Sequence, residues 1–305
     1  MSEMRSSGLR GLAVIGYGEA GKALVAGLRE DNPDMPIHLY DILFAEAEGA
    51  AMREKAAEVQ AACHDSNPAA VTQADIVLST VVAKAAPAVA EAAAAAMRPG
   101  QVFIDLNSAA PRTKQQVAEI LAPSGCTVLD GAILAPVPPH RHRVPILLCG
   151  PSAGAVTARL NSLGFNAEDG GENIGAAAAT RLLRSTLING IEALRLACAP
   201  AASHFGITER ILDSLQQSLP GGDWPERARY LVSRTAVHGE RRAVEMTEVA
   251  AMLRDIGMEP MMAEAAARRI AWGTTQDLKD ALVNGDFPSV SEMEKAFARR
   301  RNQSL

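Results

Sequence analysis

A glycine-rich turn near the N-terminus is the first place where residue types and spacing could do chemistry. The turn consists of Gly16, Tyr17, Gly18, Glu19, Ala20 and Gly21. It directly follows a predicted strand and opens a predicted helix, the context in which Gly-x-Gly-x-x-Gly binds a dinucleotide. Gly16 permits the tight turn, Gly18 lets the backbone approach a pyrophosphate, and Gly21 lets helix and strand pack closely. The turn predicts a nicotinamide dinucleotide site, and the alternative is a glycine-rich turn without a ligand.

A carboxylate at the end of the second predicted strand indicates which dinucleotide binds. Asp41 follows Gly21 by about 20 residues, where it can accept hydrogen bonds from ribose hydroxyls and would repel a 2′-phosphate. NAD is therefore favoured as the cofactor, and NADP stays possible because neighbouring loops can override one carboxylate. Thr80 ends another predicted strand, Val81 and Val82 follow it, and we expect this turn to border the cofactor as well.

An Asn-Ser pair follows the strand after that. Asn107 and Ser108 lie just beyond its carboxyl end, which is the edge where ligands bind in parallel α/β sheets. Both are candidates for contacts with substrate, and Asn107 also for contact with the cofactor. The alternative is that they and Asp105 cap the helix that begins at Pro111.

A polar stripe marks one face of the long helix predicted after residue 175. Arg181, Ser185, Asn189 and Glu192 stand three or four residues apart in an otherwise apolar stretch, so they share one face. Such a stripe usually faces a cleft or water, which makes Arg181 and Ser185 candidates for the catalytic site. An interface or a solvent-exposed face without substrate contact is the alternative.

A histidine further along the chain is the candidate for proton transfer. His238 titrates near neutral pH and can act as acid or base. It shares a predicted helix with Arg241, Arg242, Glu245 and Glu248, a spacing that also describes a solvated helix face. Both interpretations stay open.

A second histidine-containing segment, His140 to Arg143, lies in a proline-rich stretch. A metal site would need a third ligand, and none is near in the sequence. We therefore predict no metal here and expect a solvated loop.

The composition excludes several classes of protein. The 305 residues are 48% hydrophobic and 4% aromatic, which is too apolar for disorder and favours packed helices over a β-sandwich. The net charge of −5 without a basic block argues against nucleic acid as a partner. The 4 cysteines form no CxxC, so no disulfide framework is indicated and a reducing cytoplasm fits best. No apolar run is long enough for a membrane helix and the polar start does not resemble a signal peptide, so we expect a soluble, unexported, cytoplasmic protein.

The apolar pattern predicts the elements that must position these candidate residues. Short β-branched runs alternate with alanine-rich amphipathic stretches, the order of βαβ units. Strands are predicted over residues 12–15, 37–40, 76–80, 102–105, 127–133 and 145–148, with helices over 22–29, 45–60, 87–97, 113–121 and 153–163. After residue 171 the spacing becomes helical. The predicted fold class is α/β, with an N-terminal Rossmann doubly wound parallel sheet over residues 1–171 and an all-α C-terminal domain over 172–305.

Several segments together resemble the β-hydroxyacid dehydrogenase superfamily, which includes 6-phosphogluconate and 3-hydroxyisobutyrate dehydrogenases. They cover residues 16–21, 105–111, 130–136 and 175–185, and residues 238–246 resemble a branch with a phosphogluconate dehydrogenase-type helical domain. The resemblance implies a homodimer formed through the helices, an active site between the domains, and reversible hydride transfer between nicotinamide and a β-hydroxy acid or similar alcohol. It also implies that Asn107 and Ser108 touch nicotinamide and substrate.

The sequence departs from the family at the residue expected to move the proton. Arg181 stands six residues after Gly175, where the family has a lysine that serves as general acid and base. Arginine stays protonated, so Arg181 is better suited to clamp a carboxylate or stabilise an oxyanion. Ser185 replaces an asparagine, and residues 134–136 replace a serine-glycine-glycine run that receives substrate.

These observations predict an NAD(P)-dependent oxidoreductase that acts on a small molecule. Asn107, Ser108 and Arg181 would hold the substrate, and His238 would transfer the proton. An imine reductase-like enzyme and a non-catalytic dinucleotide-binding protein are the alternatives, because neither needs the family lysine.

Overall fold

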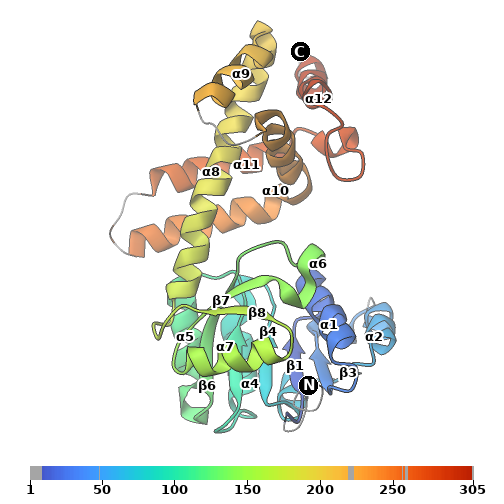
Figure 1. Ribbon diagram of the computed structural model, residues 1–305, viewed down its shortest axis with the longest axis vertical. Helices are drawn as coiled ribbons and strands as arrows, with labels where there is room; N and C mark the ends of the chain where they lie inside the picture. Colours follow the sequence, from blue (N-terminus) through green and yellow to red (C-terminus); the bar gives the residue numbers. More distant parts are fainter. Residues whose placement is uncertain (1–8, 48, 219–222, 256, 258–259, 304–305) are drawn as a thin grey trace. The chain divides into compact units, whose positions relative to one another are not determined.

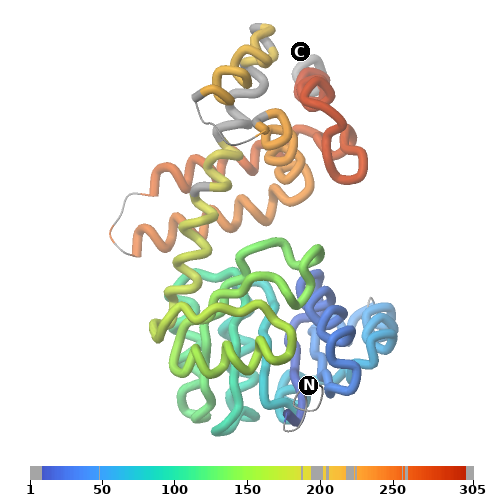
Figure 2. Tube along the Cα trace, in the orientation of Figure 1, coloured from blue at the N-terminus to red at the C-terminus, as the bar shows by residue number. Residues whose placement is uncertain are grey.

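A computed structural model describes residues 9–47, 49–218, 223–255, 257 and 260–303 of the chain. Figure 1 labels the helices and strands, and Figure 2 follows the Cα trace from the N- to the C-terminus. The chain divides into two units, Met1–Arg181 and Leu182–Leu305. The division falls inside the long helix α8 (Ala176–Phe205), whereas the sequence predicted a domain boundary near residue 171.

An 8-stranded sheet forms the centre of the first unit. Its spatial order is β3 (Ala62–Cys63), β2 (Ile37–Tyr40), β1 (Leu12–Ile15), β4 (Ile76–Ser79), β5 (Val102–Asp105), β6 (Thr127–Ile133), β7 (Pro145–Cys149) and β8 (Asn166–Asp169). Neighbouring strands are parallel, with the exception of β6 and β7. The α/β class predicted from the sequence is confirmed, and the bounds predicted for β1, β2, β5 and β6 agree with the structure.

Helices cover both faces of this sheet. They are α1 (Glu19–Asp31), α2 (Gly49–Glu58), α3 (Asn67–Val71), α4 (Ala86–Ala94), α5 (Pro111–Leu121), α6 (Val137–His140) and α7 (Ala153–Ser162). Along β1, Leu12 and Val14 join a buried cluster with residues of α1, α2 and α7. Ala13 and Ile15 join a second cluster with residues of α3, α4 and α5. Because both faces are covered, the central strands are continuous apolar runs, as in doubly wound sheets.

The predicted parallel sheet contains one antiparallel pair, formed by β6 and β7. The connection from β6 holds only α6 and the 3-10 helix η4 (Arg141–Arg143), and a parallel crossover needs a dozen residues or more. β7 therefore returns antiparallel to β6. The prediction also missed β3 and β8, because β3 is only two residues long and β8 reads Asn-Ala-Glu-Asp without an apolar run.

The second unit is helical, as predicted. After α8 it contains α9 (Thr208–Ser218), α10 (Trp224–Asp255), α11 (Met261–Thr274), the 3-10 helix η5 (Leu278–Ala281) and α12 (Val290–Gln303). A buried cluster joins Val232 of α10 to Leu278, Phe287 and Met293. None of the helices among the described residues has the length and apolar character needed to cross a membrane.

In the segment from His140 to Arg143, which we expected to be a solvated loop, three residues are exposed, but the segment is helical and His142 is buried. The His142 side chain is 3% exposed and its Nε2 lies 2.8 Å from a carboxylate oxygen of Asp31, at the end of α1. The Arg143 guanidinium donates to the same carboxylate, at 2.7 and 2.8 Å. Gly27 of α1 permits this approach, because a Cβ there would lie 2.5 Å from the His142 ring. His142 is thus a buried connection between α1 and η4.

Stability should depend on pH through His142. Burial lowers the pKa of His142, and the Asp31 carboxylate only partly opposes that shift. His142 Nδ1 is buried and has no hydrogen-bond partner in the described part of the chain, so a proton there would be unsatisfied. A histidine with a lowered pKa contributes stability above its unfolded pKa of 6.5, and that stability is lost as the pH falls below 6.5. Asp31, whose pKa is also lowered, loses its contribution only in the acid range below 3.8.

We expect urea unfolding to give a lower free energy of unfolding at pH 5.5 than at pH 7.5. The His142→Gln variant should lose roughly 1–3 kcal/mol at pH 7.5, because a buried hydrogen bond is disturbed. It should also show a smaller difference between the two pH values, since glutamine does not titrate. The exposed His140→Gln is the control and should keep the full pH difference. An unchanged pH difference in His142→Gln would contradict the assignment.

Candidate functional site

The glycine turn lies at the carboxyl end of β1, and its three glycines have different surroundings. Gly16 adopts φ +99°, and a Cβ on it would lie 2.6 Å from the Thr80 carbonyl oxygen. A Cβ on Gly21 would overlap the Gly16 carbonyl oxygen. At Gly18 a Cβ would meet nothing within 4 Å. The first and third glycines are therefore required by packing, whereas the second faces open space.

Hydrogen bonds fix this turn against its neighbours. Thr80 Oγ1 donates to the Gly16 carbonyl oxygen at 2.6 Å. The Asp41 carboxylate accepts from the amides of Tyr17, at 2.6 Å, and Leu43, at 2.9 Å. Asp41 is half-buried and holds the turn through both of its carboxylate oxygens. The β1, β2 and β4 ends thus form one connected edge.

The side chains of the candidate cofactor-binding residues differ in how far they are buried. The Tyr17 side chain is 2% exposed and packs beside Phe44, and its burial raises the pKa of the phenol to about 12. Tyr17 therefore contributes its backbone amide, and not its side chain, to the surface of the turn. Glu19 and Val82 are exposed, and Ala20 and Val81 are partly buried.

Asn107 joins the turn after β4 to the loop after β5. Its Oδ1 accepts from the Val81 amide at 2.6 Å, and its Nδ2 donates to Ser79 Oγ at 3.0 Å. Its own amide donates to Asp105 at 2.8 Å. The residue is 4% exposed. The alternative helix-capping role is not what the structure shows, because Ala110 is the N-cap of α5 and no side chain caps that helix.

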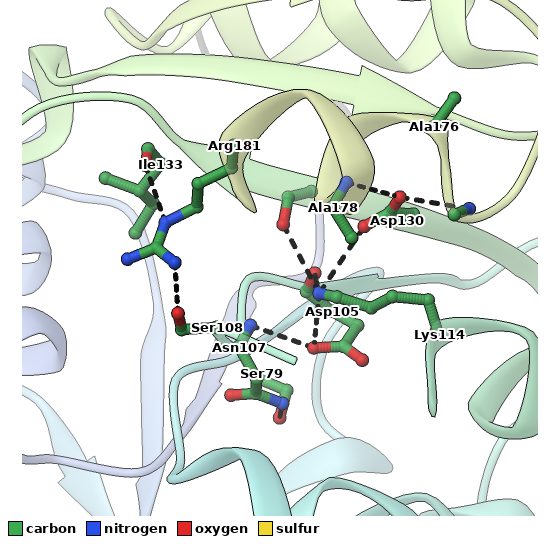
Figure 3. Close-up of polar contacts among 12 residues, drawn as sticks. Ser79, Asp105, Asn107, Ser108, Lys114, Asp130, Ile133, Ala176, Ala178 and Arg181 are labelled. Carbon is green, nitrogen blue, oxygen red and sulfur yellow. Dashed lines mark hydrogen bonds and ion pairs between the residues drawn. The ribbon is translucent and has the colours of Figure 1, made fainter. Parts of the chain in front are cut away.

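Arg181 and Ser108 form a pair beside this bridge. The Arg181 guanidinium donates to Ser108 Oγ through Nη1 and to the Ile133 carbonyl oxygen through Nε, at 3.2 Å for the latter (Figure 3). Both side chains are half-buried. The pair places a permanent positive charge and a hydroxyl group together, which is an arrangement suited to a carboxylate or a developing oxyanion.

A buried lysine beneath the pair was missed from the sequence. Lys114 is 1% exposed, and its Nζ lies 3.0 Å from Asp105 Oδ1 and 3.5 Å from Asp130 Oδ1 (Figure 3). Burial raises the pKa of Asp130, and the Lys114 ammonium opposes that rise. A signal was present, because Lys114 occupies the apolar face of α5, three residues before Val117 and seven before Leu121.

The remaining candidates belong to the second unit. Ser185 and His238 are half-buried there. Asn189 and Glu192, further along the polar stripe, are 2% and 0% exposed. Glu192 pairs with Arg242. The solvent-exposed interpretation was therefore wrong at Asn189, Glu192 and Arg242.

Potential metal ligands do not gather anywhere in the described residues, where no group of three or more histidine, cysteine or acidic side chains could hold an ion. The site of the first unit is built from a backbone turn, hydroxyl and amide side chains, and one guanidinium group.

Comparison with known protein families assigns both parts of the chain. Residues 11–153 match the NAD binding domain of 6-phosphogluconate dehydrogenase. Residues 202–273 match a domain of unknown function, DUF1932. Among curated proteins, none matches the chain.

Solved structures agree with this assignment. A conserved hypothetical protein from Sinorhizobium meliloti 1021 is 39% identical, with a TM-score of 0.78, over 95% of this chain and 96% of that chain. A conserved protein of unknown function, described as structurally similar to 3-hydroxyacid dehydrogenases, is 25% identical, with a TM-score of 0.71, over 89% and 99% of the two chains. The 3-hydroxyisobutyrate dehydrogenase of Mycobacterium tuberculosis shares the fold, at 14% identity and a TM-score of 0.69, over 93% and 98%.

Imine reductases share the fold as well. One from Myxococcus stipitatus, in complex with NADP+, is 20% identical with a TM-score of 0.54, over 94% of this chain and 99% of that chain. A variant of that enzyme is in complex with NAD+. Taken with its nucleotide turn and its helical second unit, these matches show that the chain belongs to the β-hydroxyacid dehydrogenase superfamily, in a branch that joins a 6-phosphogluconate dehydrogenase-type NAD-binding domain to a DUF1932 domain.

Proposed function

We propose that the protein is an NAD(P)-dependent oxidoreductase that transfers hydride between nicotinamide and a small hydroxy acid or related alcohol. The observation that carries the proposal is the bridge made by Asn107. Its side chain holds the turn after β4, and its neighbour Ser108 accepts from Arg181. Cofactor and substrate must be held at adjacent, fixed positions for hydride transfer. The Asn107 bridge supports such an arrangement because it joins the turn after β4, which we expect to border the cofactor, to the Ser108–Arg181 pair within one unit.

The glycine turn fits a dinucleotide. Gly18, unlike Gly16 and Gly21, leaves room for a pyrophosphate close to the backbone. It also begins α1 without a side-chain cap, so the amides of the first turn are available to an anion. Asp41 would bind the adenosine ribose and favour NAD over NADP. When bound, the nicotinamide supplies or accepts the hydride.

Arg181 would act as a fixed charge toward the substrate. A guanidinium group cannot comfortably cycle a proton, so it cannot take over the task of the family lysine. It can bind a substrate carboxylate or stabilise an alkoxide, and Ser108 would bind the same group through its hydroxyl. Ser185 and His238 stay candidates for the substrate site and for proton transfer, on the sequence argument given above.

An imine reductase is the second candidate, since that chemistry also needs hydride delivery without the family lysine. The charge of Arg181 argues against it, because a guanidinium near a cationic iminium is unfavourable by Coulomb's law, whereas a guanidinium near an alkoxide is favourable. A dinucleotide-binding protein without catalytic activity is the third candidate. Cofactor titration and a substrate panel separate the three.

Replacement of Gly18 and replacement of Gly21 should have different effects. Gly18→Ala should leave the free energy of unfolding unchanged and weaken NADH binding about tenfold, or ~1.4 kcal/mol, because the methyl group occupies the open space. Gly21→Ala should instead lower the free energy of unfolding by roughly 1–3 kcal/mol through overpacking. Fluorescence titration and urea unfolding measure the two effects. Wild-type NADH affinity in Gly18→Ala would remove the turn as the binding site.

Asp41 should determine which cofactor the protein prefers. Wild-type protein should bind NADH more tightly than NADPH. In Asp41→Ser the ratio of the two dissociation constants should shift toward NADPH by about tenfold, because the carboxylate that repels the 2′-phosphate is gone. Asp41→Ser also weakens the hydrogen bonds to the Tyr17 and Leu43 amides. That loss affects the binding of both cofactors equally, so it does not change the ratio of the two dissociation constants. Tighter NADPH binding by the wild type would reverse the assignment.

Replacement of Arg181 should reduce turnover without affecting cofactor binding. With any hydroxy acid or alcohol that the protein turns over, Arg181→Met should lower kcat/KM by roughly ten- to a hundredfold, because a hydrogen bond to a charged group is lost, while NADH affinity is kept. Arg184→Met, an exposed position on the same helix, is the control and should behave as wild type. Unchanged kcat/KM would remove Arg181 from the site.

A panel of hydroxy acids, alcohols, amines and cyclic imines, tested with Arg181→Lys and with the wild type, shows whether the native reaction of the protein differs from that of its family. Gain of hydroxy acid turnover in that variant would indicate a dehydrogenase scaffold whose native reaction has changed. Turnover of amines or cyclic imines by the wild type would favour the imine reductase. Tight NADH binding without turnover of any compound would favour the non-catalytic protein.

A further inference from the structure

Lys114 holds the start of the loop that carries Ser108. Its Nζ donates to the Asp105 carbonyl oxygen at 2.6 Å and lies 3.0 Å from Asp105 Oδ1. The same carboxylate oxygen accepts from the Asn107 amide at 2.8 Å. Since Lys114 lies on α5, just after the loop, its ammonium group fixes the loop's beginning to the helix that follows its end.

Lys114 also reaches the start of α8, by way of β6. Its Nζ donates to the Gly131 carbonyl oxygen at 3.3 Å and lies 3.5 Å from Asp130 Oδ1. The second oxygen of Asp130 accepts from the amides of Gly175 and Ala178, both at 3.0 Å. Asp130 thus caps α8, one turn before Arg181.

These contacts close a ring. Arg181 reaches back from α8 to Ser108, so the loop and the helix are joined at the surface by the Arg181–Ser108 pair and below it by Lys114 (Figure 3). Lys114 itself does no chemistry on a substrate, because it is 1% exposed and its ammonium group is occupied by hydrogen bonds to the Asp105 and Gly131 carbonyl oxygens and by ion pairs with Asp105 and Asp130.

We propose that Lys114 is a positioning residue that keeps the Arg181 guanidinium on Ser108 by tying the loop after β5 to the first turn of α8. The catalytic part of this inference rests on the proposed function. The physical reason is charge balance: without the ammonium group, Asp105 and Asp130 would be two buried carboxylates with no cation between them. Their desolvation and mutual repulsion would then loosen the loop and the helix together.

Hydrogen exchange of the full-length chain without cofactor tests the linkage directly. In Lys114→Met, amide exchange should become faster both in residues 106–110 and in residues 175–181, two segments far apart in sequence. Val117→Ala, which removes a buried contact of α5 outside the ring, is the matched control. Each protein is measured at the same interval below its own Tm, so that global instability cancels. Faster exchange confined to α5 and its loop, or equal changes in Val117→Ala, would overturn the proposal.

A milder variant covers the case in which Lys114→Met does not fold. Asp130→Asn removes one charge and keeps an oxygen to cap α8, while Lys114 keeps its bonds to Asp105. Because a neutral amide oxygen is a weaker acceptor than a carboxylate, exchange should increase in residues 175–181 and stay at the wild-type rate in residues 106–110. An equal increase in both segments would contradict the assignment of Asp130 to the α8 branch.

A double-mutant cycle supplies the catalytic readout for any substrate found with the panel. Lys114→Met should lower kcat/KM while leaving the NADH dissociation constant unchanged, and it should add little to the loss already present in Arg181→Met. Fully additive losses would show that Lys114 does not act through Arg181. A chain that shows the exchange pattern but binds neither NADH nor NADPH would remove the proposed function while supporting the linkage.

Discussion

Burying a charge in an α/β core is unfavourable unless opposite charges and hydrogen bonds come with it, and the first unit buries three charges side by side. The Lys114 ammonium lies between the carboxylates of Asp105 and Asp130, all of them about 1% exposed. The excess negative charge of this group meets the amides that open α8, the positive end of the helix dipole. The strands β5 and β6, the helix α5 and the first turn of α8 all depend on this one arrangement.

The Arg181–Ser108 pair carries a positive charge that is not readily given up as a proton. Arg181 is held by Ser108 and by the Ile133 carbonyl oxygen, so its guanidinium group has a defined orientation. In the proposed hydride transfer, such a group would stabilise negative charge in either direction and would leave the proton to another residue or to water. On the proposed function, arginine at this position would separate anion binding from proton transfer, two tasks that a lysine can perform together.

Buried polar pairs explain where expectations from the sequence failed. His142 stood in a run of histidine and arginine that resembled a solvated loop, yet it lies beneath α1 and binds Asp31. Glu192 and Arg242 carried the spacing of exposed helix faces, yet they pair with each other in the interior of the second unit. A charge pattern along one helix cannot reveal a partner more than 40 residues away, because periodicity describes a face and not what covers it.

The sequence by itself determined the elements whose cause is local. Short runs rich in β-branched and other apolar residues predicted the bounds of β1, β2, β5 and β6. Gly16, Gly18 and Gly21 predicted a tight turn, and its first and third glycines are closely packed. Tertiary structure alone decided the antiparallel β7, the edge strands β3 and β8, the burial of Tyr17 and the meeting of Arg181 with Ser108. The physical reason is that strand direction, burial and charge pairing depend on contacts between segments that are distant in the chain, and their energies exist only once those segments have packed together.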